Sequence, residues 1–241
     1  MNILSIGNSF SADAHQYLHR IAAADGVKLN TFNLYIGGCP LSKHYRNMLS
    51  GEREYTLEMN GVSTGFHVSL QEALLNRDWD VVTFQQASHV STKYDRYQPY
   101  LNKLVEYVRE CVPKAKLFFH ETWAYEQDSL KLTETAGYTD QKAMYLDIAA
   151  AARQAAQDME ADGLIPCGTV FQKLLEKGVE KVHRDTFHAS LGLGRYALGL
   201  TWYRTLTGNS VAENTFADFD EPVSPEEMAL AKACVAEVTE K

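Results

Sequence analysis

The 241-residue sequence predicts an α/β fold in which helices cover both faces of a parallel sheet. Short apolar runs of strand length alternate along the chain with stretches of helical periodicity, and this alternation favours parallel pairing of the strands. Hydrophobic residues make up 45% of the chain, which is enough for one large core. We therefore expect residues 1–241 to form a single domain.

The chain begins with a strand-helix-strand pattern. The apolar run Asn2–Ile6 predicts the first strand, and the helical pattern of Ala12–Ala24 predicts a helix with Ser11 or Asp13 as its N-cap. The run Lys28–Ile36 predicts the second strand, because it is apolar and stops at a pair of glycines.

A hairpin is expected next. The segments Glu54–Met59 and Val62–Val68 flank Asn60-Gly61, a dipeptide typical of two-residue hairpin turns. We expect this hairpin to embellish the domain over residues 52–68.

The rest of the chain continues the alternation of strands and helices. Three strands are expected, at Asp80–Gln85, Lys116–His120 and Leu164–Cys167. Four helices are expected, at Tyr97–Cys111, Asp140–Met159, His188–Leu206 and Pro225–Val238.

Charge and composition exclude several classes of partner. The net charge is −8 and there is no basic stripe, so we expect no nucleic-acid partner. No window approaches the ~18 apolar residues of a membrane span. The N-terminal residues do not resemble a signal peptide, and the four scattered cysteines form no CxxC motif. These features predict a reduced cytoplasmic protein, unless a signal peptide has been removed; they carry no signal for an oligomeric state.

The ends of the predicted strands are rich in glycine and polar residues. In an open parallel sheet, ligands bind beyond the carboxyl ends of the strands. The first four ends are Gly7-Asn8-Ser9, Gly37-Gly38-Cys39, Gln85-Gln86-Ala87-Ser88 and His120-Glu121-Thr122-Trp123. We expect the functional site at this edge.

Three residues have the chemistry of a serine hydrolase. Ser9 follows the first strand and is the candidate nucleophile, His188 is its candidate base, and Asp185 is placed to orient the imidazole. Each also has a purely structural interpretation: Ser9 in a turn that caps a helix, Asp185 as the N-cap of the next helix, and His188 as a surface histidine.

Further candidates lie at the other strand ends. The Gly38 amide is a candidate oxyanion donor, because glycine lets a substrate approach closely, and the Gln86 side-chain amide is another. Gln85 is its rival, because strand alternation directs only one of the two toward the site. Trp123 is a candidate for lining a substrate cleft, or else it packs in the core. No HExxH motif is present, so no metal is expected.

These motifs, in this order, resemble the SGNH/GDSL hydrolase superfamily, and within it the divergent DUF4886 branch. Gly7-Asn8-Ser9-Phe10 matches that branch's variant of the serine block, Gly38 matches the glycine block, and Asp185-Thr186-Phe187-His188 matches the Asp-x-x-His block. The usual Gly-x-Asn-Asp after the third strand is absent. Phe84-Gln85-Gln86-Ala87-Ser88 stands there and resembles the glutamine of sialate and xylan acetylesterase relatives, which puts Gln86 in the role of the asparagine.

The resemblance implies a flavodoxin-like, three-layer α/β/α domain with a five-stranded parallel sheet in the order 2-1-3-4-5. It also implies a serine esterase that needs no cofactor and acts on a small-molecule ester, such as an acylated carbohydrate. Nothing in the sequence fixes the leaving group. The alternative is a binding module that recognises a sugar or another polar ligand on the same scaffold without turnover. A nucleotide-binding flavodoxin-like protein is disfavoured because no phosphate loop is present.

Overall fold

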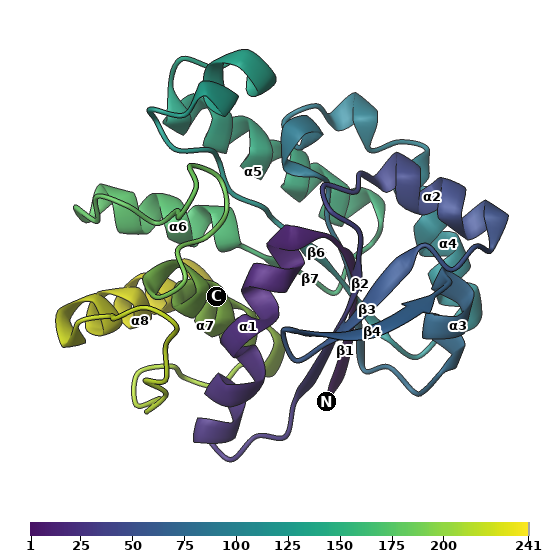
Figure 1. Ribbon diagram of the computed structural model, residues 1–241, viewed down its shortest axis with the longest axis horizontal. Helices are drawn as coiled ribbons and strands as arrows, with labels where there is room; N and C mark the ends of the chain where they lie inside the picture. Colours follow the sequence, from purple (N-terminus) through teal and green to yellow (C-terminus); the bar gives the residue numbers. More distant parts are fainter. Residues whose placement is uncertain (241) are drawn as a thin grey trace.

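A mixed seven-stranded sheet lies between two layers of helices in the computed structural model, which describes residues 1–240 (Figure 1). The strands lie in the order β4-β3-β2-β1-β5-β6-β7. Their bounds are β1 Asn2–Gly7, β2 Asn30–Tyr35, β3 Tyr55–Met59, β4 Val62–Val68, β5 Val81–Phe84, β6 Lys116–His120 and β7 Gly163–Ile165.

The five parallel strands follow the predicted order, but the prediction of a five-stranded parallel sheet was wrong. The strands β2-β1-β5-β6-β7 pair in parallel, whereas β3 pairs antiparallel with β2 and β4 pairs antiparallel with β3. The hairpin therefore extends the sheet instead of standing apart from it. Its turn forms as expected, since Asn60 and Gly61 have φ values of 51° and 79°, a left-handed conformation that asparagine and glycine tolerate.

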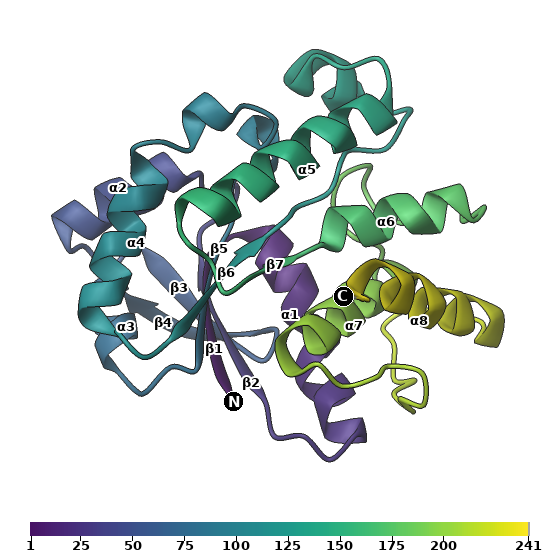
Figure 2. The ribbon, with the colours of Figure 1, turned by 180° about the vertical axis from the view of Figure 1, so that it is seen from behind.

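In the described residues 1–240, eight α-helices cover the two faces of the sheet (Figures 1 and 2). One face carries α1, α6, α7 and α8, and the other carries α2, α3, α4 and α5. Their bounds are α1 Ser9–Ala24, α2 Leu41–Ser50, α3 Leu70–Leu75, α4 Tyr100–Cys111, α5 Gln141–Asp158, α6 Cys167–Glu176, α7 Leu193–Thr207 and α8 Pro225–Thr239. A π-helical segment at Lys131–Ala136 precedes α5.

The central strand is buried on both sides. Ile3 packs into the core beneath α1 and α7, while Leu4 and Ile6 pack into the core on the opposite face. Full burial of each such side chain stabilises the fold by about 1.5–3 kcal/mol. This core holds β1 in the middle of the sheet, and with it the turn that follows.

Several predicted boundaries were wrong for local reasons. The first helix begins at Ser9, because Asn8, rather than Ser11 or Asp13, caps it by accepting a hydrogen bond from the Phe10 amide. The helix expected from His188 begins only at Leu193. Cys167, expected in a strand, instead opens α6.

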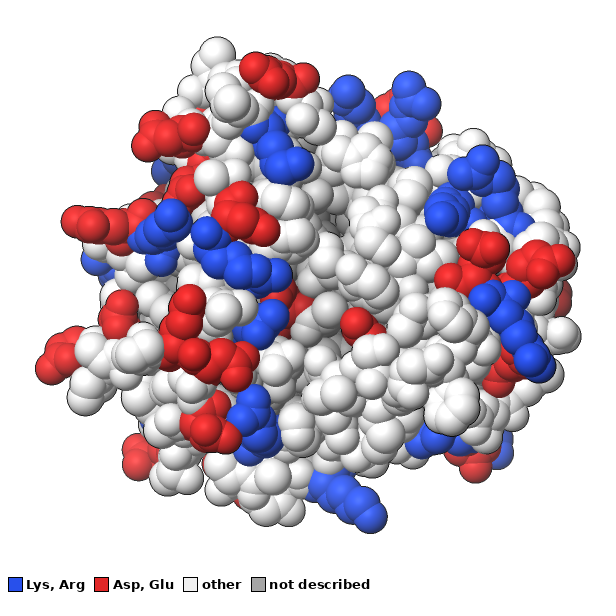
Figure 3. Space-filling view, viewed as in Figure 1, with Lys and Arg blue, Asp and Glu red and all other residues white. Residues whose placement is uncertain are grey.

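No helix within residues 1–240 is long and apolar enough to cross a membrane. On the face shown in Figure 3, charged side chains of both signs are interspersed along the flanks, and the middle of the face is largely uncharged. The cytoplasmic location expected from the sequence stays a prediction.

Candidate active site

The turn between β1 and α1 places Ser9 at the carboxyl edge of the sheet. Gly7 is required there, because a Cβ at this position would lie 1.8 Å from the Ser11 hydroxyl oxygen. Ser9 is then the first residue of α1, where the backbone N–H groups of a helix N-terminus favour developing negative charge.

Asn8 ties this turn to two neighbouring loops. Its Oδ1 accepts hydrogen bonds from the Phe10 amide at 2.9 Å and from Gln85 Nε2 at 2.7 Å, and its Nδ2 donates to the Cys39 carbonyl at 3.3 Å. An aspartate could accept both of the first two bonds but could not donate the third. The contacts therefore give a physical reason for asparagine in this serine motif.

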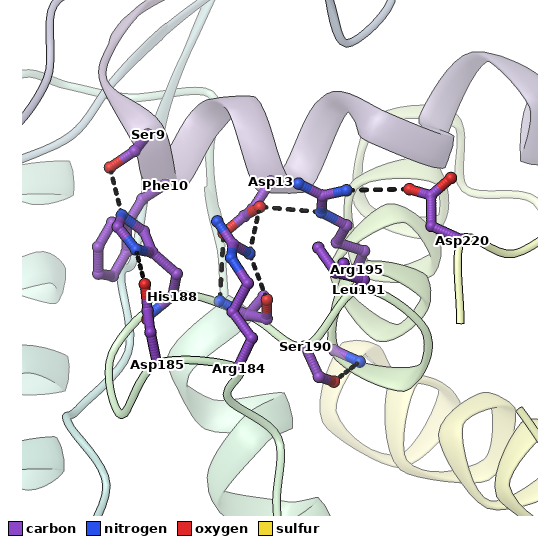
Figure 4. A network of polar contacts seen from close by, with 12 residues as sticks. Ser9, Phe10, Asp13, Arg184, Asp185, His188, Ser190, Leu191, Arg195 and Asp220 are labelled. Carbon is purple, nitrogen blue, oxygen red and sulfur yellow. Dashed lines mark hydrogen bonds and ion pairs between the residues drawn. The ribbon is translucent and has the colours of Figure 1, made fainter. Parts of the chain in front are cut away.

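Ser9, His188 and Asp185 form a chain of hydrogen bonds (Figure 4). The distance from Ser9 Oγ to His188 Nε2 is 2.9 Å, and from His188 Nδ1 to Asp185 Oδ2 it is 2.7 Å. Because a carboxylate only accepts, Nδ1 carries the proton and Nε2 is left bare to accept from the Ser9 hydroxyl. This is the tautomer a general base needs.

Asp185 also shapes its own loop. Its Oδ1 accepts from the backbone amides of His188 at 2.8 Å and Phe187 at 3.4 Å. Burial acts to raise the pKa of Asp185, but hydrogen bonds from the His188 ring and from these two amides outweigh burial and hold the pKa below its ordinary value. Asp185 does not cap α7, which begins eight residues later at Leu193.

Two aromatic rings lie close to the His188 ring. The ring centroid lies 3.9 Å from that of Phe187 and 5.9 Å from that of Phe10. Trp123 stacks on Phe10 at 4.1 Å and donates its indole N–H to the Phe187 carbonyl at 2.8 Å. The prediction that Trp123 lines a substrate cleft was therefore wrong: the residue is 1% exposed and packs in the core, which is the alternative that the sequence left open.

Gly38 lies in the exposed loop after β2, beside the turn that carries Ser9. Its φ of 60° is left-handed, and a Cβ there would meet open space, so glycine is required by backbone conformation rather than by crowding. Within residues 1–240, the amides of Ser9 and Gly38 have no hydrogen-bond acceptor. Both are therefore free to donate to a ligand.

The two glutamines do not behave as predicted. Strand β5 ends at Phe84, so alternation stops before them, and both side chains are buried. Gln86 accepts from the Leu41 and Ala87 amides at 3.1 and 2.9 Å and donates to the Arg96 carbonyl at 3.1 Å. These contacts anchor the start of α2, and none reaches Ser9.

The Gln85 side chain forms hydrogen bonds to the β1–α1 turn. Besides its bond to Asn8, its Oε1 accepts from the Ser11 hydroxyl and lies 3.0 Å from His120 Nδ1. Sequence reasoning missed the roles of Asn8 and Gln85 as connectors. The signal for Asn8 was its place between the first strand and a helix start, where asparagine is a preferred N-cap.

The family model for a domain of unknown function, DUF4886, matches residues 2–238. The chain belongs to the DUF4886 family. A DUF4886 protein of known structure from Bacteroides uniformis is 32% identical, with a TM-score of 0.93 over 99% of this chain and 95% of that one. No curated protein matches the chain.

The fold of this chain is similar to that of SGNH hydrolases, as the motifs indicated. A candidate SGNH hydrolase from Slackia heliotrinireducens has a TM-score of 0.62 at 24% identity, over 86% of this chain and 98% of that one. An acetylxylan esterase from Geobacillus stearothermophilus has a TM-score of 0.53 at 14% identity, over 84% of this chain and 90% of that one. At these identities the likeness concerns the fold alone.

Proposed function

We propose that this protein is a serine esterase that hydrolyses a small acyl ester through an acyl-enzyme. The observation that carries the proposal is the hydrogen-bond chain from Ser9 Oγ to His188 and on to Asp185, set at the carboxyl edge of a parallel sheet. The turn and the loop that form it are 179 residues apart in the sequence.

In the proposed reaction, Ser9 Oγ attacks the ester carbonyl carbon while its proton passes to His188 Nε2. The tetrahedral intermediate collapses, the C–O bond to the alcohol breaks, and His188 returns the proton to the leaving oxygen. Water then attacks the acyl-serine and gives its proton to His188. The bond between the acyl carbon and Ser9 Oγ breaks, His188 returns the proton to Oγ, and the acid leaves. Asp185 stabilises the imidazolium at both stages without taking its proton.

The oxyanion is held by the amides of Ser9 and Gly38 in this proposal. Ser9 begins helix α1 and Gly38 lies in a glycine loop, and neither amide has a protein acceptor within the described chain. Each such donor contributes about 10²–10³ in kcat in comparable sites. By likeness to the acetylxylan esterase fold, an acetyl group on a sugar is the substrate class to test first.

A panel of nitrophenyl esters of increasing chain length and acetylated sugars tests the proposal. We expect turnover of short acyl esters by the wild type and none by Ser9→Ala with the same melting temperature. Wild-type protein that releases no product from any member of the panel would refute an esterase of small acyl groups.

A second candidate is a non-catalytic module that binds a sugar or another polar ligand. One observation favours this candidate. The side chains of Gln85 and Gln86 form hydrogen bonds to other residues of the protein, so neither contacts Ser9 as a third oxyanion donor. Calorimetry with acetylated and deacetylated sugars distinguishes the two. A binding module holds the acetylated sugar without releasing acetate, whereas an esterase releases it.

A further inference from the structure

The loop that carries Asp185 and His188 has little regular structure of its own. Between residues 182 and 190 it contains only one isolated bridge, from His183 to Ala189. Thr186, in its middle, has a φ of 72°, which is a strained conformation for a β-branched residue. Such strain persists only where surrounding contacts hold the backbone.

A buried carboxylate on α1 holds this loop (Figure 4). Asp13 lies one helical turn after Ser9, and its side chain is 2% exposed. Its oxygens accept from Arg184 Nη1 at 2.9 and 3.0 Å, from Arg195 Nε at 2.9 Å and from the Ala189 amide at 3.2 Å.

These contacts bracket the two residues of the loop that act with Ser9. Arg184 directly precedes Asp185, and Ala189 directly follows His188. Arg184 also closes the loop on itself, since its amide donates to the His188 carbonyl and its guanidinium donates to the Ala189 carbonyl at 2.5 Å. Asp13 therefore contacts the loop both before and after His188 in the sequence.

We propose that Asp13 is a positioning residue, which uses Arg184, Arg195 and the Ala189 amide to hold His188 against Ser9. This inference rests on the proposed esterase function for its kinetic readout. Ser9 and Asp13 occupy consecutive turns of α1, so the helix that presents the nucleophile also fixes the distance to its base. A misplacement of about 1 Å at such a contact can cost about 10²-fold in rate.

The other hydrogen bonds of the loop do not join the backbone beside His188 to α1. The Trp123 indole and the backbone of Ala124 hold Phe187 and His183 to the segment after β6, not to α1. The Tyr17 hydroxyl joins α1 to the Leu191 carbonyl, beyond the end of the loop. Asp13 is thus the side chain of α1 that contacts the backbone next to His188.

The test compares Asp13→Asn with Asp218→Asn. Asp218 pairs with Arg20, also on α1, but this ion pair is exposed and does not touch the loop, so its loss is a matched control. Asparagine keeps the size of Asp13 and removes the charge that both guanidinium groups need. We expect kcat to fall about 10–10²-fold in Asp13→Asn with KM within about twofold, and no change in Asp218→Asn.

Hydrogen exchange gives a second readout that needs no activity. In Asp13→Asn, the Ala189 and Arg184 amides should exchange faster than in the wild type, while amides of the central strand β1 stay protected. If Asp13→Asn does not fold, Arg184→Met serves instead, because Arg195 and the Ala189 amide still pair with Asp13 and keep α1 in place. Loss of the Arg184 guanidinium removes its bonds to Asp13 and to the Ala189 carbonyl, so the backbone amide at position 184 should exchange faster while the Ala189 amide stays protected.

The inference is overturned if exchange at Ala189 in Asp13→Asn, or at position 184 in Arg184→Met, and kcat of that folded variant both equal those of the wild type. It is also overturned if only the melting temperature falls, because a merely structural ion pair would do that. Wild-type protein without esterase activity refutes the proposed function instead, and exchange at Ala189 then decides the role of Asp13 by itself.

Discussion

The two segments that meet at the candidate site are held in different ways. The turn that presents Ser9 joins a central strand to a helix, and these two regular elements fix it together with the side chains of Asn8 and Gln85. The loop that presents His188 lies between α6 and α7, and its conformation depends on side chains. Asp185 of the loop itself, Trp123 and Asp13 of α1 each form a hydrogen bond to its backbone.

Because of this difference, substitutions in the two segments should have different effects. Regular structure places the nucleophile, so replacing the Ser9 side chain should leave its surroundings intact. Side chains place the base, so single substitutions around the loop should alter catalysis without unfolding the domain.

Ser9→Ala should abolish ester turnover, a loss on the order of 10⁶ where the catalytic groups act as a unit. Its melting temperature should equal that of the wild type, because Asn8 and not Ser9 caps α1. Kinetics with a short nitrophenyl ester and a thermal scan check both parts. Undiminished turnover would show that another group is the nucleophile.

Asp185→Asn should lower turnover by roughly 10–10⁴, because the amide can reverse the hydrogen bond to His188 Nδ1 and favour the wrong tautomer. The loss is expected to fall short of a fully buried site, since the Asp185 side chain is 46% exposed. Asparagine can still accept from the Phe187 and His188 amides, so the melting temperature should hold. Unchanged turnover would leave Asp185 with a purely structural role.

Gln85→Ala and Gln86→Ala probe the turn that presents Ser9 and the loops beside it. Each removes a buried side chain whose partners would lose their hydrogen bonds, so each should lower the free energy of unfolding by about 1–3 kcal/mol per group left unpaired. Urea unfolding measures this. Should Gln86→Ala instead lower kcat by about 10²–10³ at unchanged stability, Gln86 is the oxyanion donor that the sequence suggested.

As the pH falls, the protein should lose stability through His15 on α1 before it loses the contribution of Asp185. Burial lowers the pKa of His15 from 6.5 to about 3. At pH values between these two, His15 is protonated in the unfolded chain but neutral in the native state. The free energy of unfolding therefore falls as pH drops through this window, by about 1.4 kcal/mol for this residue at about pH 5.5. The pKa of Asp185 is depressed, so its contribution is lost only below 3.8.

Urea unfolding at about pH 7.5 and about pH 5.5 checks this order for the wild type and His15→Gln. The variant should lose less stability than the wild type by about the same 1.4 kcal/mol. Equal losses in the two proteins would mean that His15 does not carry the acid dependence.

Much of the sheet could be predicted because strands and hairpin turns leave local signals. The five apolar runs and Asn60-Gly61 are such signals, and periodicity alone located them. The pairing of β3 with β2 could not be predicted, because it depends on which edge of the sheet is open. The helix start was misplaced because Ser11 and Asp13 are as good caps by type as Asn8.

The candidate site divides in the same way. Ser9, Asp185 and His188 could be chosen because their chemistry and order are specific, and the structure brings all three together. The environment of Gln86 and Trp123 could not be predicted, since it depends on contacts with Leu41 and Phe187 far along the chain. The sequence offered only one signal for the role of Asp13, which is an acidic residue on the buried side of an amphipathic helix.

The central claim is that Ser9 is a nucleophile activated by His188. Labelling with a fluorophosphonate probe, followed by mass spectrometry of the intact protein and its peptides, tests this most directly. We predict one probe per chain, attached at Ser9, no adduct in Ser9→Ala and a strongly slowed reaction in His188→Ala. A wild-type protein that takes up no probe, or a Ser9→Ala variant labelled as readily as the wild type, would contradict the claim.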